Sequence, residues 1–256
     1  MPMCGRYALM ATAEELIEHF GLMEVEDFPA RYNIAPTQPI LIVEPAPPGE
    51  RGSNAPDRKA LLVRWGLIPG WVKDPGEFTL LLNARSETAI DKPSFRAAMR
   101  HRRVLIPASG FYEWHRPSKE SGEKSQVYWI RPKQGGIVAF AGLMETYLSK
   151  DGSEIDTGCI LTVAANQTIR PVHDRMPVVI ARQDFPRWLD CLSQEPREVA
   201  DLMKPADEDL FEAIAVSDLV NKVANLGPDL QTPVTPRFEL QKPASKKSDG
   251  GQMSLF

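Results

Sequence analysis

Cys4 lies within Met3-Cys4-Gly5-Arg6-Tyr7, and its side chain is the first in the chain that could act as a nucleophile. If the chain were trimmed to begin at Cys4, this residue would carry an α-amine and a thiol on adjacent carbons. With an aldehyde, such a 1,2-aminothiol forms a Schiff base, which the thiolate closes into a five-membered thiazolidine. The alternative is a small buried apolar residue, because free cysteine is among the most buried residue types.

Glu113 is the second residue with a chemical signal, because it stands between Tyr112 and Trp114. An aromatic, poorly solvated environment raises the pKa of a carboxyl group and allows it to act as a general acid. The alternative role is a structural ion pair.

His173 begins a His-Asp-Arg triplet inside Pro171–Pro177. The two prolines favour a loop that presents the imidazole, whereas an ordinary surface histidine is the alternative. Asn83 and Arg85 are two residues apart, so on an extended segment they face the same way and could hold a sugar hydroxyl and a phosphate. The alternative for this pair is an ordinary strand end.

Two tryptophans flank the segment Trp65–Trp71, which also contains glycines and a proline. Such a pattern is typical of a corner of the core. An exposed Trp71 could instead be a plate on which a nucleic-acid base stacks.

Composition indicates a protein with a substantial core, because the chain has 256 residues and 43% of them are hydrophobic. Three widely spaced cysteines predict neither a disulfide framework nor a zinc site, and we assign Cys159 and Cys191 to the core. No apolar run approaches the roughly 20 residues that cross a bilayer. We therefore expect a cytoplasmic monomer that needs no metal or cofactor.

Charge is unevenly distributed along the chain, although the net charge is −4. Residues 58–116 contain 11 Lys/Arg and 5 Asp/Glu, a net charge of +6. Residues 184–240 contain 5 Lys/Arg and 12 Asp/Glu, a net charge of −7. A local basic face can bind phosphates despite the acidic total, and solvated surface is the alternative.

The hydrophobic pattern predicts an α+β fold with a β-rich, barrel-like core and peripheral helices. Thr12-Ala13-Glu14-Glu15 reads as a capping box that starts a helix ending at Gly21. Helical spacing returns only at Phe185–Leu192 and Arg197–Met203. Strands are predicted at Pro39–Val43, Ala60–Trp65, Val104–Pro107, Gln126–Ile130, Ile137–Leu143, Cys159–Ala164 and Val178–Ile180. Residues 45–58 read as an exposed loop. One domain over residues 3–240 is expected, followed by a disordered tail over 241–256.

Taken together, these motifs resemble the SRAP family, the SOS-response-associated peptidases, whose members cross-link to abasic sites in single-stranded DNA. The resemblance runs from Met3 to about Leu230 and includes Val216-Ser217 and Asn225-Leu226-Gly227. It implies a single domain whose positive groove holds single-stranded DNA at its junction with duplex. A protein of this kind would associate with the nucleoid when bound to DNA.

The resemblance also implies roles for four reactive residues. Cys4 matches the nucleophile that forms the thiazolidine with the ring-opened deoxyribose, and Asn83 matches an asparagine that holds the site beside it. Glu113 matches the glutamate that assists self-processing of the N-terminus and proton transfer at the sugar. His173 matches the histidine implicated in opening the sugar ring and in reversing the link.

Six further residues match the family's DNA-binding positions. The arginines that match phosphate contacts are Arg6, Arg85 and Arg175. The residues that match positions lining the DNA path, or wedging between bases, are Asn33, Pro36 and Trp71.

One departure concerns the N-terminus. Family members begin Met-Cys, whereas this chain begins Met1-Pro2-Met3-Cys4. Removal of Met1 alone would leave Cys4 without a free amine, so three cases are open: a true start at Met3, autocatalytic removal of residues 1–3, or no thiazolidine chemistry. We favour a start at Met3.

The leading hypothesis is therefore a covalent sensor of abasic sites in single-stranded DNA. One alternative is a thiol peptidase in which Glu113 and His173 assist Cys4. Another is a non-covalent reader of modified bases.

The last five residues, Gln252-Met253-Ser254-Leu255-Phe256, resemble the bacterial sliding-clamp-binding motif. In that motif a glutamine precedes a Leu-Phe pair that fills a hydrophobic pocket of the clamp. The residues expected to bind the clamp are Gln252, Leu255 and Phe256. The alternative is a tail that folds back on its own domain.

Overall fold

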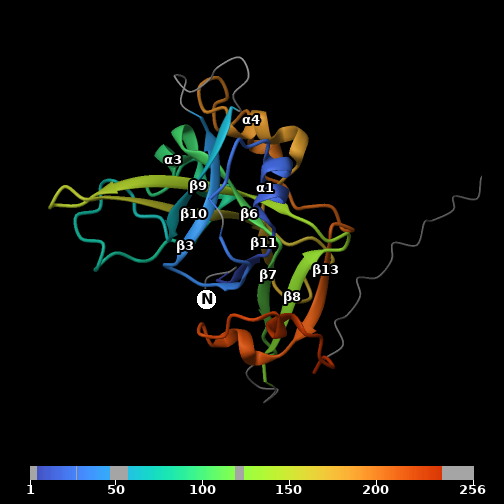
Figure 1. Ribbon diagram of the computed structural model, residues 1–256. Helices are drawn as coiled ribbons and strands as arrows, with labels where there is room; N and C mark the ends of the chain where they lie inside the picture. Colours follow the sequence, from blue (N-terminus) through green and yellow to red (C-terminus); the bar gives the residue numbers. More distant parts are fainter. Residues whose placement is uncertain (1–4, 27, 47–56, 119–123, 238–256) are drawn as a thin grey trace, which may run out of the picture.

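Strands occupy much of the chain between residues 7 and 180 in the computed structural model, which describes residues 5–26, 28–46, 57–118 and 124–237 (Figure 1). In chain order they are β1 (Tyr7–Leu9), β2 (Arg31–Ile34), β3 (Pro39–Pro45), β4 (Arg58–Trp65), β5 (Asn83–Arg85), β6 (Arg103–Ala108), β7 (Gly110–His115), β8 (Gln126–Pro132), β9 (Val138–Leu148), β10 (Glu154–Ala164), β11 (Arg175–Pro177), β12 (Val179–Ile180) and β13 (Phe211–Val216). All seven predicted strands are confirmed, with shifted ends.

Five of these strands close into a barrel. The order β10-β4-β3-β6-β9 returns to β10, because β9 pairs with it in antiparallel register. Apolar side chains on these strands fill the core, and Gly142 of β9 leaves room for the side chain of Ile106 on the neighbouring strand β6. A Cβ atom at Gly142 would lie 2.7 Å from Cδ1 of Ile106. The predicted β-rich, barrel-like core is confirmed.

A second sheet, in the order β13-β8-β7-β1-β2, leads away from the barrel. Gly110 makes the passage from β6 to β7 possible, since its φ is +154° and a Cβ atom there would lie 2.4 Å from the carbonyl oxygen of Ile130. Tyr7 of β1 pairs with Phe111 of β7 and with Ile34 of β2. This central position of β1 places Arg6 beside the strand that carries Glu113.

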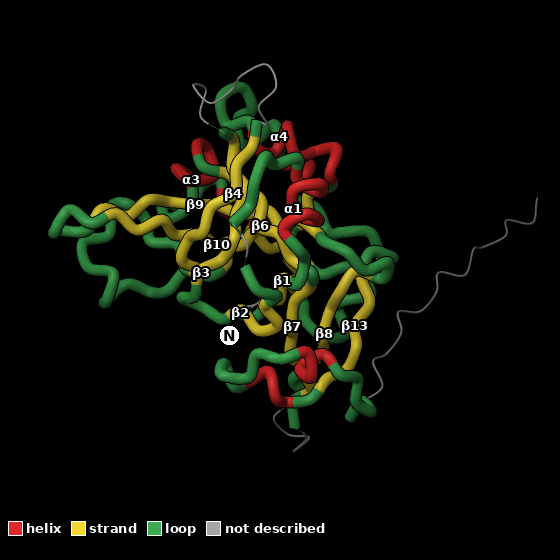
Figure 2. Tube along the Cα trace, in the orientation of Figure 1, coloured by secondary structure: helices red, strands yellow, loops and turns green. Residues whose placement is uncertain are grey.

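The helices lie around the strands (Figure 2). They are α1 (Ala13–Phe20), α2 (Ser86–Ala89), α3 (Arg96–His101) and α4 (Phe185–Leu189). The capping box of α1 is confirmed: Thr12 Oγ1 accepts from the N–H of Glu15, and Glu15 Oε2 accepts from the N–H of Thr12 at 2.8 Å. Gly21 ends this helix at a φ of 65°.

The predictions for the other helices were only partly right: the helix predicted at Phe185–Leu192 exists as the shorter α4, whereas α2 and α3 were missed. Helices α2 and α3 have four and six residues, too short for a 3.6-residue period to emerge from the sequence. Helix α4 ends at Leu189, because the Asp190 carboxylate accepts from the N–H groups of Leu192 and Ser193. The predicted helix over 197–203 contains only a 3₁₀ turn, Ala200–Leu202.

Cys159 lies in the core as predicted, and burial raises the pKa of its thiol. Cys191 follows α4 and is only partly buried, so its assignment to the core was wrong. In the described part of the chain, no helix is long and apolar enough to cross a membrane. Cys4, most of the predicted 45–58 loop and the predicted tail lie outside the described residues.

Candidate functional site

A pocket of about 550 Å³ gathers residues from six separate parts of the chain. The residues that line it are Gly5, Arg6, Pro36, Leu82, Glu113, Trp114, Arg116, Val172, His173 and Asn221. Four of the residues predicted from the sequence are among them, and Gly5 is the neighbour of Cys4 in the chain.

The alternation of β7 places Glu113 in this pocket. Phe111 packs into the main core, whereas Tyr112 on the opposite face packs against Trp129 of the second sheet. The Tyr112 hydroxyl donates to the carbonyl oxygen of Tyr32 at 2.8 Å, and burial raises the pKa of Tyr112 to about 12. Glu113 lies on the same face of β7 as Phe111 and is 3% exposed. The predicted poorly solvated environment of this carboxyl group is confirmed.

His173 reaches the pocket from a tightly bonded turn between β10 and β11. The N–H of His173 donates to the carbonyl oxygen of Ile169, and Ala165 bonds to Asp174 across the base of the turn. Nδ1 of His173 accepts from the N–H of Arg175 at 3.1 Å, so in the neutral ring the proton resides on Nε2. Burial lowers the pKa of His173 below its ordinary value of 6.5, although the charge of Asp174 opposes this effect and that of Arg116 adds to it.

Two arginines make the pocket cationic. Arg6 is held in place, because its Nη1 donates to Asn33 Oδ1 at 2.9 Å and to the carbonyl oxygen of Val220 at 2.5 Å. Arg116 is exposed and follows Glu113 by three residues. A carboxyl group and an imidazole for proton transfer thus lie beside two groups that attract anions.

A family model described as "SOS response associated peptidase (SRAP)" matches residues 3–223. The chain belongs to the SRAP family. The match begins at Met3, directly before Cys4, and covers every residue that lines the pocket.

Two bacterial proteins are among the relatives of this chain. The abasic site processing protein YoqW of Bacillus subtilis is 38% identical over 232 residues, covering 89% of this SRAP chain and 98% of the relative. The abasic site processing protein YedK of Escherichia coli is 31% identical over 241 residues, covering 91% and 100%.

A solved structure supports the fold. A protein from Bacteroides thetaiotaomicron superimposes with a TM-score of 0.77 at 24% identity, covering 91% of this chain and all of that protein. At this identity the likeness concerns the fold alone. This SRAP chain therefore shares its fold with that protein over most of its length.

Other predicted residues of this SRAP protein lie outside the pocket lining. Asn83 and Arg85 form the ends of β5, directly after Leu82, and Arg85 is exposed. Trp71 is 58% exposed and makes an edge contact with Phe78, whereas Trp65 is fully buried. Trp65 is thus part of the core, and the predicted stacking of a base on Trp71 stays a prediction.

Asn33 and Arg175 are engaged within the protein. Asn33 is 2% exposed and donates to the carbonyl oxygens of Val220, Lys222 and Asn225. Arg175 forms a bidentate ion pair with Glu87. Their predicted roles in binding DNA stay predictions.

Polar residues missed from the sequence include Arg116 and Asn221, which line the pocket, and Glu87, which pairs with Arg175. Arg116 carried no clear signal, because it follows the end of β7 and a spacing of three does not place two side chains on one face of a strand. Glu87 lies two residues after Arg85, but its partner Arg175 is 88 residues away and could not be identified from the sequence. Asn221, whose Oδ1 accepts from Trp114 Nε1 at 2.9 Å, carried no signal.

Proposed function

We propose that this protein detects abasic sites in single-stranded DNA and captures them covalently through Cys4. The observation that supports this most is the pocket beside Gly5, which combines the buried carboxyl group of Glu113 with the imidazole of His173 and with Arg6. The names of the relatives, abasic site processing proteins, agree with this substrate.

The proposed reaction is a condensation with the ring-opened sugar. The α-amine of Cys4 attacks C1′ of the aldehyde, and loss of water gives an imine. The thiol then adds across the C=N bond, with sulfur bonding to carbon and the proton going to nitrogen. Glu113 protonates the leaving hydroxyl group, and His173 assists ring opening, since both processes move protons at groups of poor intrinsic acidity.

A free amine on Cys4 is a requirement of this reaction. We propose translation from Met3 followed by removal of that methionine, with autocatalytic removal of residues 1–3 assisted by Glu113 as the second route. Both routes end at the same 1,2-aminothiol.

Two exposed side chains would guide the DNA. The exposed Arg85 would neutralise a phosphate, and the exposed Trp71 would stack on a base at the junction of single-stranded and duplex DNA. Pro36 lines the pocket itself and would contact the strand as it enters.

An oligonucleotide with one abasic site tests the proposal. Protein whose N-terminal residue has been verified by mass as Cys4 is expected to form an adduct stable in a denaturing gel, and Cys4→Ala to form none. Peptide fragments should carry the mass of a thiazolidine. Verified protein that forms no adduct would overturn the covalent function. Retained non-covalent binding would then favour a reader of modified bases, and cleavage of protein substrates would favour a thiol peptidase.

The C-terminal sequence supports a further partner, the bacterial sliding clamp. We expect a peptide of residues 246–256 to bind the clamp with micromolar affinity, about −8 kcal/mol. Replacing Leu255 and Phe256 with alanine should abolish binding in fluorescence anisotropy. Equal binding of the two peptides would refute this partner.

A further inference from the structure

Asn221 reaches the pocket from the segment that follows β13. Residues Asp218–Asn221 form a single 3₁₀ turn, and the side chain of Val220 within it is buried against the second sheet. The carbonyl oxygen of Val220 accepts from the side chains of Arg6 and Asn33. These contacts hold the main chain beside Asn221, whose own side chain is exposed.

The side-chain amide of Asn221 has a fixed orientation, because it is bonded to Trp114. The indole N–H of Trp114 can only donate, so the amide atom 2.9 Å from it is the oxygen Oδ1. The nitrogen Nδ2 therefore carries two hydrogens that Trp114 does not use. In the described part of the chain, no acceptor contacts Nδ2. A side chain that lines the pocket thus offers two donors to a ligand.

Two guanidinium groups line the same pocket. Nη1 of Arg6 is engaged within the protein, whereas Nη2 makes a long contact of 3.4 Å with the main-chain oxygen of Asn221. Arg116 is exposed, and among the described residues its guanidinium has no hydrogen-bond or ion-pair partner. Both arginines can therefore attract an anion into the pocket.

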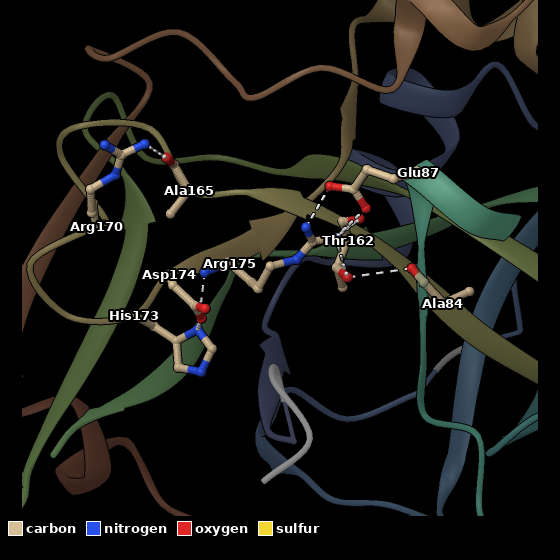
Figure 3. A network of polar contacts seen from close by, with 8 residues as sticks. All are labelled: Ala84, Glu87, Thr162, Ala165, Arg170, His173, Asp174 and Arg175. Atoms are coloured by element: carbon tan, nitrogen blue, oxygen red, sulfur yellow. Dashed lines mark hydrogen bonds and ion pairs between the residues drawn. The ribbon is translucent and has the colours of Figure 1, made fainter.

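His173 adds another donor. Figure 3 shows that Nδ1 of this ring faces Asp174 and the N–H of Arg175, at 3.1 Å from each. In the neutral ring the proton therefore resides on Nε2, on the other side of the ring. Among the described residues that line the pocket, Glu113 is the only one with an acidic side chain. The lining therefore fits a ligand that is rich in acceptors and carries negative charge.

The phosphodiester group is the part of DNA with this chemistry. An abasic nucleotide has no base to recognise, but it keeps a phosphate on each side of its sugar. Asparagine side chains are among the groups that contact phosphate oxygens in DNA complexes, and such contacts fix the register of the strand. The amide of Asn221 is therefore suited to hold one of these two phosphates.

We propose that Asn221 is a DNA-binding residue: Nδ2 donates to an oxygen of a phosphate next to the abasic sugar, while Trp114 holds Oδ1. The contact places the sugar in register with Glu113 and His173 and is independent of the base sequence. For the nature of its ligand, the inference rests on the proposed function. It adds a neutral donor to the predicted arginine contacts, and such a donor contributes affinity without releasing counterions.

Asn221→Asp separates the two ends of the side chain. A carboxylate still accepts from Trp114 Nε1, but it replaces the two donors with an anionic oxygen. Binding is measured by fluorescence anisotropy with a single-stranded oligonucleotide that contains a tetrahydrofuran analogue of the abasic site, which has no aldehyde and cannot cross-link. Asn221→Ala should weaken binding by about tenfold, the effect of losing one hydrogen bond to a charged group. Asn221→Asp should weaken it further, because the carboxylate also repels the phosphate.

Val223→Asp is the matched control for charge. It adds the same charge two residues away, at a side chain that is 41% exposed, and removes no donor. Salt at about 0.15 M screens such an exposed charge, so this variant should lose less than about threefold in affinity. Equal losses for Asn221→Asp and Val223→Asp would show repulsion alone and would overturn the contact.

A purely structural role predicts another pattern. If Asn221 only supported Trp114, Asn221→Asp would bind as the wild type does, whereas Asn221→Ala and Trp114→Phe would lose affinity equally. That result would overturn the contact. The salt slope provides a further check: Asn221→Ala should keep the wild-type slope, since a neutral donor releases no counterions.

Neutral linkages locate the phosphate. A methylphosphonate on the 5′ or the 3′ side of the analogue removes one phosphate charge at a time. At one of the two positions, the difference in affinity between the wild type and Asn221→Ala should disappear, and at the other it should persist. A difference that persists at both positions, or that changes with the neighbouring base, would assign the amide to a base edge and refute the phosphate contact.

Failure of the proposed function has a separate signature, because the analogue forms no adduct. Protein verified to begin at Cys4 that binds the analogue, but does not cross-link to a true abasic site, would overturn covalent capture and leave the contact of Asn221 standing. Wild-type affinity in Asn221→Asp would overturn the contact alone. Wild-type protein that does not bind the analogue would refute the contact as well.

Discussion

Arg6 and Asn33 share an acceptor that is 214 and 187 residues away in the chain: both side chains donate to the carbonyl oxygen of Val220. They also bond to each other at 2.9 Å. Together they fasten the segment of Asn221, which lines the pocket, to β1 and β2. The integrity of the pocket wall thus depends on two polar side chains that the sequence had assigned to DNA.

Replacing Asn33 with alanine should lower the free energy of unfolding by about 1 to 3 kcal/mol, because buried acceptors and the Arg6 donor lose a partner. Urea denaturation would measure this loss. Lys222→Ala is the control, since Asn33 bonds only to the main-chain oxygen of that exposed residue. A stability equal to that of the wild type, combined with weaker DNA binding, would show that Asn33 acts on DNA.

Glu113→Gln should keep DNA binding but slow cross-linking by about 10² to 10⁴, the usual contribution of proton transfer. The amide keeps the size of the side chain and removes its acidity. Single-turnover gels would give the rate, and Glu212→Gln on β13 is an exposed control. Cross-linking of Glu113→Gln at the wild-type rate would show that Glu113 takes no part in forming the link.

The stability of the protein should fall in acid partly because of His173. Burial lowers the pKa of this residue in the folded state, so below its ordinary value of 6.5 the unfolded chain binds more protons. The free energy of unfolding therefore decreases as the pH falls from 6.5 toward the folded-state pKa. Replacing His173 with glutamine should weaken this decrease. Urea denaturation at pH 7.5 and pH 5.5 tests it, and an identical decrease in both proteins would contradict the assignment.

Trp71→Ala should weaken binding to single-stranded DNA by about 1 to 3 kcal/mol, the range for one aromatic side chain stacked on a base. Stability should change by no more than about 0.5 kcal/mol, since the side chain is 58% exposed. Leu148→Ala provides the control, because Leu148 is exposed to a similar extent (62%). A loss of stability without a loss of affinity for single-stranded DNA would show that Trp71 has a structural role instead.

Arg85→Ala should reduce the magnitude of the salt slope for single-stranded DNA by about 0.7, the value for one lost phosphate contact. Fluorescence anisotropy between 50 and 200 mM salt, roughly the range in which such slopes are measured, provides the test. Arg131→Ala removes an exposed arginine that is paired with Glu212 and serves as the control. A slope unchanged in Arg85→Ala would exclude that contact.

Local rules were sufficient for the elements with strong patterns. The capping box of α1 needs only Thr12 and Glu15, which are one helical turn apart, and the strand predictions depended on short apolar runs. The family could also be identified, because the motifs around Cys4, Glu113 and His173 keep their order along the chain. The burial of Glu113 followed from its neighbours Tyr112 and Trp114.

The sequence alone could not tell which predicted arginines are exposed and which are paired within the protein, because their partners come from distant segments. Arg175 and Glu87 are 88 residues apart and meet only because β5 and β11 both pair with β10. Arg85, at the end of β5 and two residues before Glu87 of α2, stays exposed. Residue type and spacing therefore determined which chemistry this protein could carry, whereas strand register, a tertiary property, decided which charges face solvent and which hold the site together.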